Sequence, residues 1–127
     1  MVAPVTISAF TAIGSDERGL SAEFVLPRPQ DAFLYLTRKA GSLSGNAYHE
    51  GKTLATNPKI FLLLTGKIIF SYRVMNTSSS VSIEVIAPAK IEVVPYVTHN
   101  VVVVEDCVML EGNSLADIKH DRLFQEV

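Results

Sequence analysis

Residues 45–67 read GNAYHEGKTLATNPKIFLLLTGK, and a second motif, PYVTH, follows at residues 95–99. Each motif ends its turn in a histidine, His49 or His99, four residues after the glycine or proline that opens it. Between the two turns, residues 60–64 are uncharged and apolar on both faces, as expected for a strand buried in a barrel wall. The sequence therefore predicts a buried strand with a histidine-containing turn on either side.

A period of two, which is typical of half-buried strands, extends outward from this stretch. We expect strands at residues 6–12, 20–26, 32–37, 60–64, 67–74, 81–85, 91–94, 100–104 and 107–110. Thr65-Gly66 is expected to be a turn, and the pattern changes only after Asn113, where residues 115–123 fit a short helix capped by Ser114. Short strands at regular spacing predict an all-β sandwich or barrel, and periodicity alone does not separate a jelly roll from an immunoglobulin-like sandwich.

Length and composition indicate one globular domain over residues 1–127, because 48% of the residues are hydrophobic and 19% are charged. A net charge of −2 gives no electrostatic reason to expect a nucleic acid or an anionic membrane as partner. The longest apolar runs are strand-sized, and the N-terminus lacks the basic start and apolar core of a signal peptide. We therefore expect a cytoplasmic protein, in which the single cysteine, Cys107, is a buried and inert thiol.

The two turns and the strand between them resemble the two half-motifs of the cupins. The sequence Gly45-Asn46-Ala47-Tyr48-His49 is most similar to cupins of nucleotide-sugar and capsular-polysaccharide pathways, in which Gly-x-His-x-His leads into a strand ending in Gly-Lys. The resemblance covers about residues 32–112. It implies a cupin-type jelly-roll β-barrel with a short C-terminal helix, and a histidine cluster inside the barrel to which both halves contribute.

The motif departs from the metal-binding members of that family at two positions. There, the first half-motif supplies His-x-His and a glutamate and the second supplies a third histidine, which together hold a divalent metal. Here Ala47 replaces the first histidine and Lys59 replaces the glutamate. A lysine ammonium has no lone pair for a metal and repels a cation, so we expect no metal and no other cofactor.

The sugar-pathway members offer a chemistry without metal, because epimerases and ketoisomerases of this group move protons beside a keto group with a histidine base and a tyrosine acid. The resemblance makes His49 the base. Tyr72 and Tyr96 are the candidate acids, while His99, Arg38 and Arg73 are the candidate substrate-binding residues. Ser44 stands where this group commonly has an arginine for the substrate diphosphate, which leaves Arg38 and Arg73 as the candidate anion clamps.

Three functions remain open at this stage. The first is an isomerase or epimerase that acts on a nucleotide-linked keto sugar, the second is a non-catalytic module that binds a sugar, and the third is a metal-dependent cupin with a reduced two-histidine site. For each we expect a small-molecule ligand, with a sugar nucleotide as the leading candidate. We also expect a homodimer, because the apolar N-terminal strands around residues 5–10 and 22–25 are suited to pairing between subunits.

Overall fold

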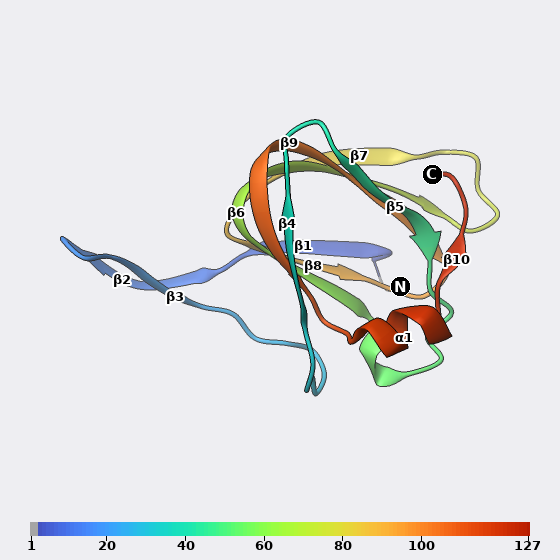
Figure 1. Ribbon diagram of the computed structural model, residues 1–127, viewed down its shortest axis with the longest axis horizontal. Coiled ribbons are helices and arrows are strands. Elements are labelled where there is room, and N and C mark those ends of the chain that lie inside the picture. The colour runs from blue at the N-terminus through green and yellow to red at the C-terminus, as the bar shows by residue number, and fades with distance from the viewer. Residues whose placement is uncertain (1–2) are drawn as a thin grey trace.

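The computed structural model describes residues 3–127, which form a β-barrel with one short helix (Figure 1). The strands are β1 (Val5–Ala9), β2 (Thr11–Asp16), β3 (Gly19–Glu23), β4 (Leu34–Arg38), β5 (Leu43–Tyr48), β6 (Lys59–Val74), β7 (Val81–Ile86), β8 (Ala89–Val93), β9 (Val97–Glu111) and β10 (Leu123–Phe124). A 3₁₀ turn, η1 (Leu54–Thr56), precedes β6, and helix α1 (Leu115–His120) follows β9.

One antiparallel sheet of eight strands makes up the barrel, in the order β1-β8-β6-β9-β5-β10. Strand β4 also pairs with β9, and β7 with β6, so the two long strands β6 and β9 each take part in both sides of the barrel. The all-β jelly-roll prediction is confirmed. The inward faces of these strands form the core, which includes Phe61, Phe70 and Met109 as well as the predicted buried thiol of Cys107.

Two of the expected boundaries are wrong. Thr65-Gly66 is not a turn but a bulged bend inside β6, where the ladder with β9 shifts register between Leu63 and Ile68. Likewise, residues 100–104 and 107–110 belong to one continuous strand, β9. The bend requires a glycine, because Gly66 has φ +89° and a Cβ there would lie 2.4 Å from the carbonyl oxygen of Asp106.

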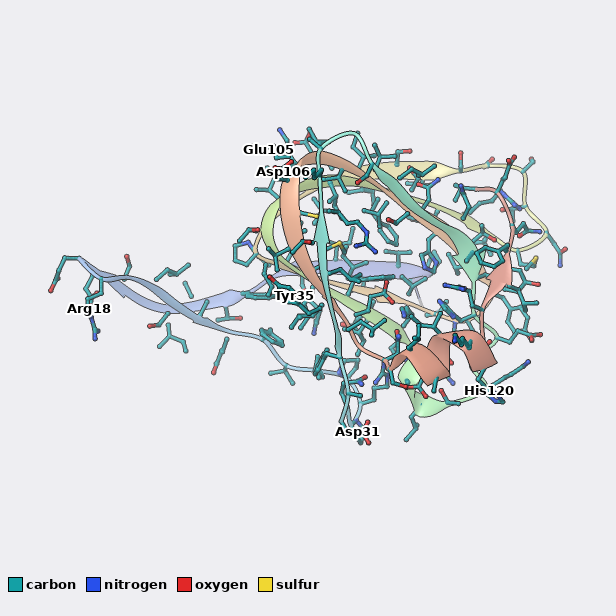
Figure 2. All side chains as sticks on the ribbon, in the orientation of Figure 1. Arg18, Asp31, Tyr35, Glu105, Asp106 and His120 are labelled. Carbon is teal, nitrogen blue, oxygen red and sulfur yellow. The ribbon has the colours of Figure 1, made fainter. Side chains whose placement is uncertain are left out.

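The expected N-terminal strand at residues 6–12 is divided in two. Its first part, β1, pairs with β8 in the barrel, whereas the second part, β2, pairs with β3 in a separate hairpin. This hairpin projects away from the barrel, and Arg18 lies near its tip (Figure 2). Almost all of its side chains are exposed, including Ile13 and Leu20. The hairpin therefore buries little surface within this chain.

The predicted C-terminal helix is confirmed as α1, with Ser114 as its N-cap. The Ser114 hydroxyl accepts a hydrogen bond from Asp117 N–H, and the Asp117 carboxylate accepts one from Ser114 N–H, which completes a capping box. Ile118 is the buried residue of the helix, while His120 points outward into solvent (Figure 2). Within residues 3–127, no helix has the length and apolar character needed to cross a membrane.

Candidate functional site

A cavity of about 200 Å³ lies inside the barrel, between the strands and the C-terminal segment. Its walls are Leu36, Arg38, Ser44, Gly45, Ala47, His49, Lys59, Phe61, His99, Val101, Met109, Glu111, Ile118, Arg122 and Phe124. The two motif histidines therefore converge in one cavity, as the cupin-type barrel predicts.

Strand pairing brings the histidines together. Ala47 of β5 lies opposite His99 of β9, and His49 follows two residues after Ala47, on the same side of the chain. The rings of His49 and His99 are 5.7 Å apart between centroids. Phe61 and Phe70 contact the His99 ring at centroid distances of 5.6 and 5.7 Å, so both imidazoles lie in a largely apolar wall.

The proton of His49 has a defined place. Its Nδ1 is hydrogen-bonded to the main-chain carbonyl oxygen of Asp121. Because a carbonyl oxygen can only accept, Nδ1 carries the proton and donates it, which leaves the lone pair on Nε2. Within residues 3–127, no protein group hydrogen-bonds Nε2. The ring is 5% exposed, and burial, followed by the positive charge of Lys59, lowers its pKa below 6.5. His49 is therefore a neutral imidazole with a free basic nitrogen.

Asp121 also organises the loop that follows His49. Its carboxylate accepts hydrogen bonds from the N–H groups of Glu50 and Lys52, both at 2.8 Å, and from the Thr56 hydroxyl at 2.7 Å. Burial works to raise the pKa of Asp121, but these bonds outweigh it and lower the pKa to about 2. The residue after helix α1 thus fixes both the His49 ring and the loop next to it.

His99 is the imidazole whose pKa burial lowers further. Burial lowers its pKa to about 3, so the ring is neutral at physiological pH. Its Nδ1 donates to the carbonyl oxygen of Val97 at 3.0 Å. With its orientation fixed in this way, His99 presents a neutral polar edge to the cavity.

A buried ion pair forms part of the cavity wall. Lys59 Nζ lies 2.9 Å from Glu111 Oε2, and the lysine side chain is only 2% exposed. Burial lowers the pKa of Lys59, while the Glu111 charge opposes that shift. Glu111 of β9 lies opposite Phe61 of β6, and Lys59 is two residues before Phe61 on the same face. Lys59 and Glu111 are therefore diagonal neighbours across the two strands, which brings their charges together.

These residues do not fit a metal ion. Among the residues that the structure describes, no three His, Cys, Asp or Glu side chains are arranged to hold one. The cavity carboxylate, Glu111, is already paired with Lys59, whose ammonium repels a cation. The ammonium group of Lys59 therefore disfavours a divalent cation beside Glu111.

The other predicted site residues are divided between the cavity and its surroundings. Arg38 lines the cavity, and its Nε lies 3.3 Å from the Ser44 hydroxyl. Tyr72 is opposite His99 in the β6–β9 ladder but packs against the core. Tyr96 is 46% exposed and donates its hydroxyl to Glu50 at 3.3 Å, and Arg73 donates to the carbonyl oxygen of Glu126 at 2.7 Å. Tyr72, Tyr96 and Arg73 are not among the residues of the cavity wall.

Sequence reasoning missed Glu111 and Arg122 and treated Lys59 only as a lost metal ligand. One signal for Glu111 was available, because it shares the period-two face of β9 with Met109 and His99. Arg122 lies between helix α1 and the two-residue strand β10, so no strand pattern points to it.

Comparison with known proteins supports this architecture. The chain aligns with a variant of the QdtA 3,4-ketoisomerase from Thermoanaerobacterium thermosaccharolyticum in complex with TDP, with a TM-score of 0.75 and 19% identity over 97% of this chain and 88% of that one. Another structure of that ketoisomerase holds TDP-4-keto-6-deoxyglucose, with a TM-score of 0.74 and 17% identity over 97% and 88% of the two chains.

The epimerase RmlC from Legionella pneumophila, in complex with dTDP-4-keto-L-rhamnose, is also similar, with a TM-score of 0.71 and 14% identity over 97% of this chain and 73% of that one. No model of a protein family matches the chain, and no curated protein does. The structural likeness confirms the cupin-type fold that the two half-motifs imply.

Proposed function

We propose that the protein is an isomerase or epimerase that moves a proton beside the keto group of a nucleotide-linked sugar, with His49 as the general base. The observation that carries this proposal is the state of His49, a neutral imidazole whose tautomer is fixed by the Asp121 carbonyl and whose Nε2 is free. A group of this kind accepts a proton at neutral pH without further tuning. The ligands in the similar ketoisomerase and epimerase structures support the choice of substrate class.

In this reaction His49 Nε2 removes a proton from the carbon next to the carbonyl group. The electron pair of the C–H bond forms a C=C bond, and the carbonyl oxygen becomes an enolate oxygen. The Lys59 ammonium, held by Glu111 in the same cavity, is suited to stabilise that negative charge. In an epimerase, a proton from solvent then adds to the other face of the same carbon. In a ketoisomerase, the hydroxyl proton of that carbon moves to the enolate oxygen, the proton held by His49 adds to the carbon that carried the keto group, and the neighbouring carbon becomes the new keto carbon.

Proton exchange is the direct test. Wild-type protein incubated with TDP-4-keto-6-deoxyglucose in D₂O should incorporate deuterium beside the keto group, and product should appear. His49→Asn keeps a similar size and offers its amide Nδ2 as a donor in place of the imidazole Nδ1, but it removes the basic nitrogen, so exchange should fall by roughly 10²–10⁴. His120→Asn is the matched control, because His120 lies on the outer side of α1. Unchanged exchange in His49→Asn would show that the base is elsewhere.

A non-catalytic sugar-binding module is the second candidate. The position of Tyr96 favours it, because this candidate acid lies outside the cavity wall and is hydrogen-bonded to Glu50. Such a module binds the nucleotide sugar, and its melting temperature rises with the logarithm of the ligand concentration above the Kd. It gives no deuterium exchange, which separates it from the enzyme.

We also propose that the protein works in the cytoplasm as a homodimer, in which the β2–β3 hairpin packs against a second copy. Exposed apolar side chains on and after the hairpin support this assembly, namely Ile13 at 66%, Leu20 at 59% and Val25 at 75% exposure. Light scattering at micromolar concentration should give twice the chain mass of 13.8 kDa. Replacing Ile13 and Leu20 by Ser should give the mass of one chain, and a wild-type mass of one chain contradicts the proposal.

A further inference from the structure

The cavity wall carries more positive charge than the chain as a whole. It contains three cationic side chains, Arg38, Lys59 and Arg122, against one anionic side chain, Glu111, although the complete chain has a net charge of −2. Since Lys59 and Glu111 neutralise each other at 2.9 Å, the excess charge belongs to the two arginines. Both are less buried than Lys59, and Arg122 is exposed. The excess positive charge of the wall is therefore carried by side chains that solvent reaches.

Arg122 belongs to a C-terminal tail, residues 122–127, that is held against the barrel. In this tail, β10 pairs with β5, and Phe124 lies opposite the inward-facing Ala47. Beyond β10, the Gln125 N–H donates to the Asn46 carbonyl oxygen at 2.9 Å. Two side chains of the barrel also bind the tail: Thr98 contacts Gln125 at 2.7 Å, and Arg73 donates to the Glu126 carbonyl oxygen at 2.7 Å.

Two side chains of the tail take part in the cavity wall. Arg122 immediately precedes the two-residue strand β10, whose Leu123 is not among the residues of the wall. Both Arg122 and Phe124 line the cavity, and the Arg122 guanidinium lies 4.8 Å from the centre of the Phe124 ring. The Phe124 side chain is still 72% exposed, so most of its surface is open to a ligand.

We propose that Arg122 and Phe124 form the part of the site that binds the nucleoside diphosphate end of the ligand, in which Arg122 holds a phosphate oxygen and Phe124 stacks on the base. This inference rests on the proposed function, which puts the sugar ring beside His49. A guanidinium is suited to bind phosphate oxygens, and an open aromatic ring is a platform on which a planar base stacks. The tail thereby determines which sugars are accepted, since it selects those that carry a nucleotide.

Binding measurements on the full chain test the proposal, with thymidine diphosphate and inorganic pyrophosphate as the two probes. Arg122→Gln should weaken thymidine diphosphate binding about tenfold to a hundredfold and make the remaining binding less sensitive to salt. Phe124→Ala should weaken thymidine diphosphate about tenfold and leave pyrophosphate unchanged, because only the base stacks. Leu123→Ala is the matched control, because it changes the same tail at a residue that is not part of the cavity wall.

The outcome does not depend on catalysis. His49→Asn should lose deuterium exchange and still bind thymidine diphosphate as the wild type does. If the wild type binds thymidine diphosphate and both tail variants bind it equally well, the tail assignment is overturned while the proposed function stands. If the wild type binds neither probe, the tail assignment is overturned too. Equal melting temperatures of Arg122→Gln, Phe124→Ala and wild type show that a loss of binding does not come from unfolding.

Discussion

Replacing Glu111 by Gln is expected to leave an unpaired cation inside the barrel. The Lys59 side chain is 2% exposed, and its Nζ has the Glu111 carboxylate at 2.9 Å as its hydrogen-bond partner. Removing one member of a buried pair typically costs about 3–5 kcal/mol, because the remaining charge stays desolvated. Small domains have a total stability of roughly 5–15 kcal/mol, so the melting temperature should fall by roughly 10–20 °C.

The pH dependence of the stability that Glu111→Gln loses identifies the cause of the loss. Burial already lowers the pKa of Lys59 from 10.5, and Glu111 counteracts the shift, so the pKa falls further when the carboxylate is removed. A lysine whose pKa is lower in the folded state binds more protons when unfolded, and stability then rises with pH. The deficit of Glu111→Gln should therefore be largest near pH 7 and shrink as the pH is raised toward 10.

Urea denaturation at pH 7 and at pH 9.5 measures both effects. The double variant Lys59→Met/Glu111→Leu should recover most of the stability, since it removes both charges instead of one. Asp16→Asn is the control, because the Asp16–Arg18 pair lies on the exposed hairpin and its loss should not move the midpoint. If Glu111→Gln is as stable as the wild type at pH 7, or if its deficit is the same at both pH values, Lys59 is not a desolvated cation.

Three further predictions concern other parts of the structure. Lys59→Met should raise the pKa of His49, since the Lys59 charge helps to lower it, and an NMR titration of the imidazole measures the change. Asp121→Asn should cost about 1.5–3 kcal/mol at pH 7. Because the folded-state pKa of Asp121 is about 2, against an ordinary 3.8, this difference should persist above pH 4 and disappear as the pH falls through 2, which acid denaturation curves will show. Gly66→Ala should cost more than about 2 kcal/mol in urea denaturation because of its positive φ and the close carbonyl, whereas Gly14→Ala, with no atom within 4 Å, should be neutral.

Much of the barrel could be predicted from the sequence, because apolar and polar residues alternate along a half-buried strand. This period of two located β7 and β8, its end after Asn113 located the start of helix α1, and the two half-motifs identified two histidines that meet in the cavity. The sequence was misleading at Gly66, where a glycine that usually marks a turn instead permits a bend within a continuous strand. Local patterns do not distinguish these cases, since the difference depends on the partner strand.

The candidate site was harder to predict for the same reason. Lys59 and Glu111 are far apart in the sequence, and only the pairing of β6 with β9 brings their charges into contact. Arg73 was a candidate anion clamp because Ser44 replaces the expected arginine, but its guanidinium donates to the Glu126 carbonyl oxygen of the tail. Such contacts follow from the closed topology of the barrel, and no spacing in the sequence specifies them.

The long strand β9 has a consequence for how the protein folds. It pairs with β4, β5 and β6, and it carries His99 near one end and Glu111 at the other. Each of these pairings joins segments that are distant in the sequence, and such topologies fold on the slow side, in milliseconds to seconds. Because the same strand supplies both His99 and Glu111 to the cavity wall, the cavity and the sheet should form in one cooperative step. Slow hydrogen exchange of the β9 amides should then report on global unfolding.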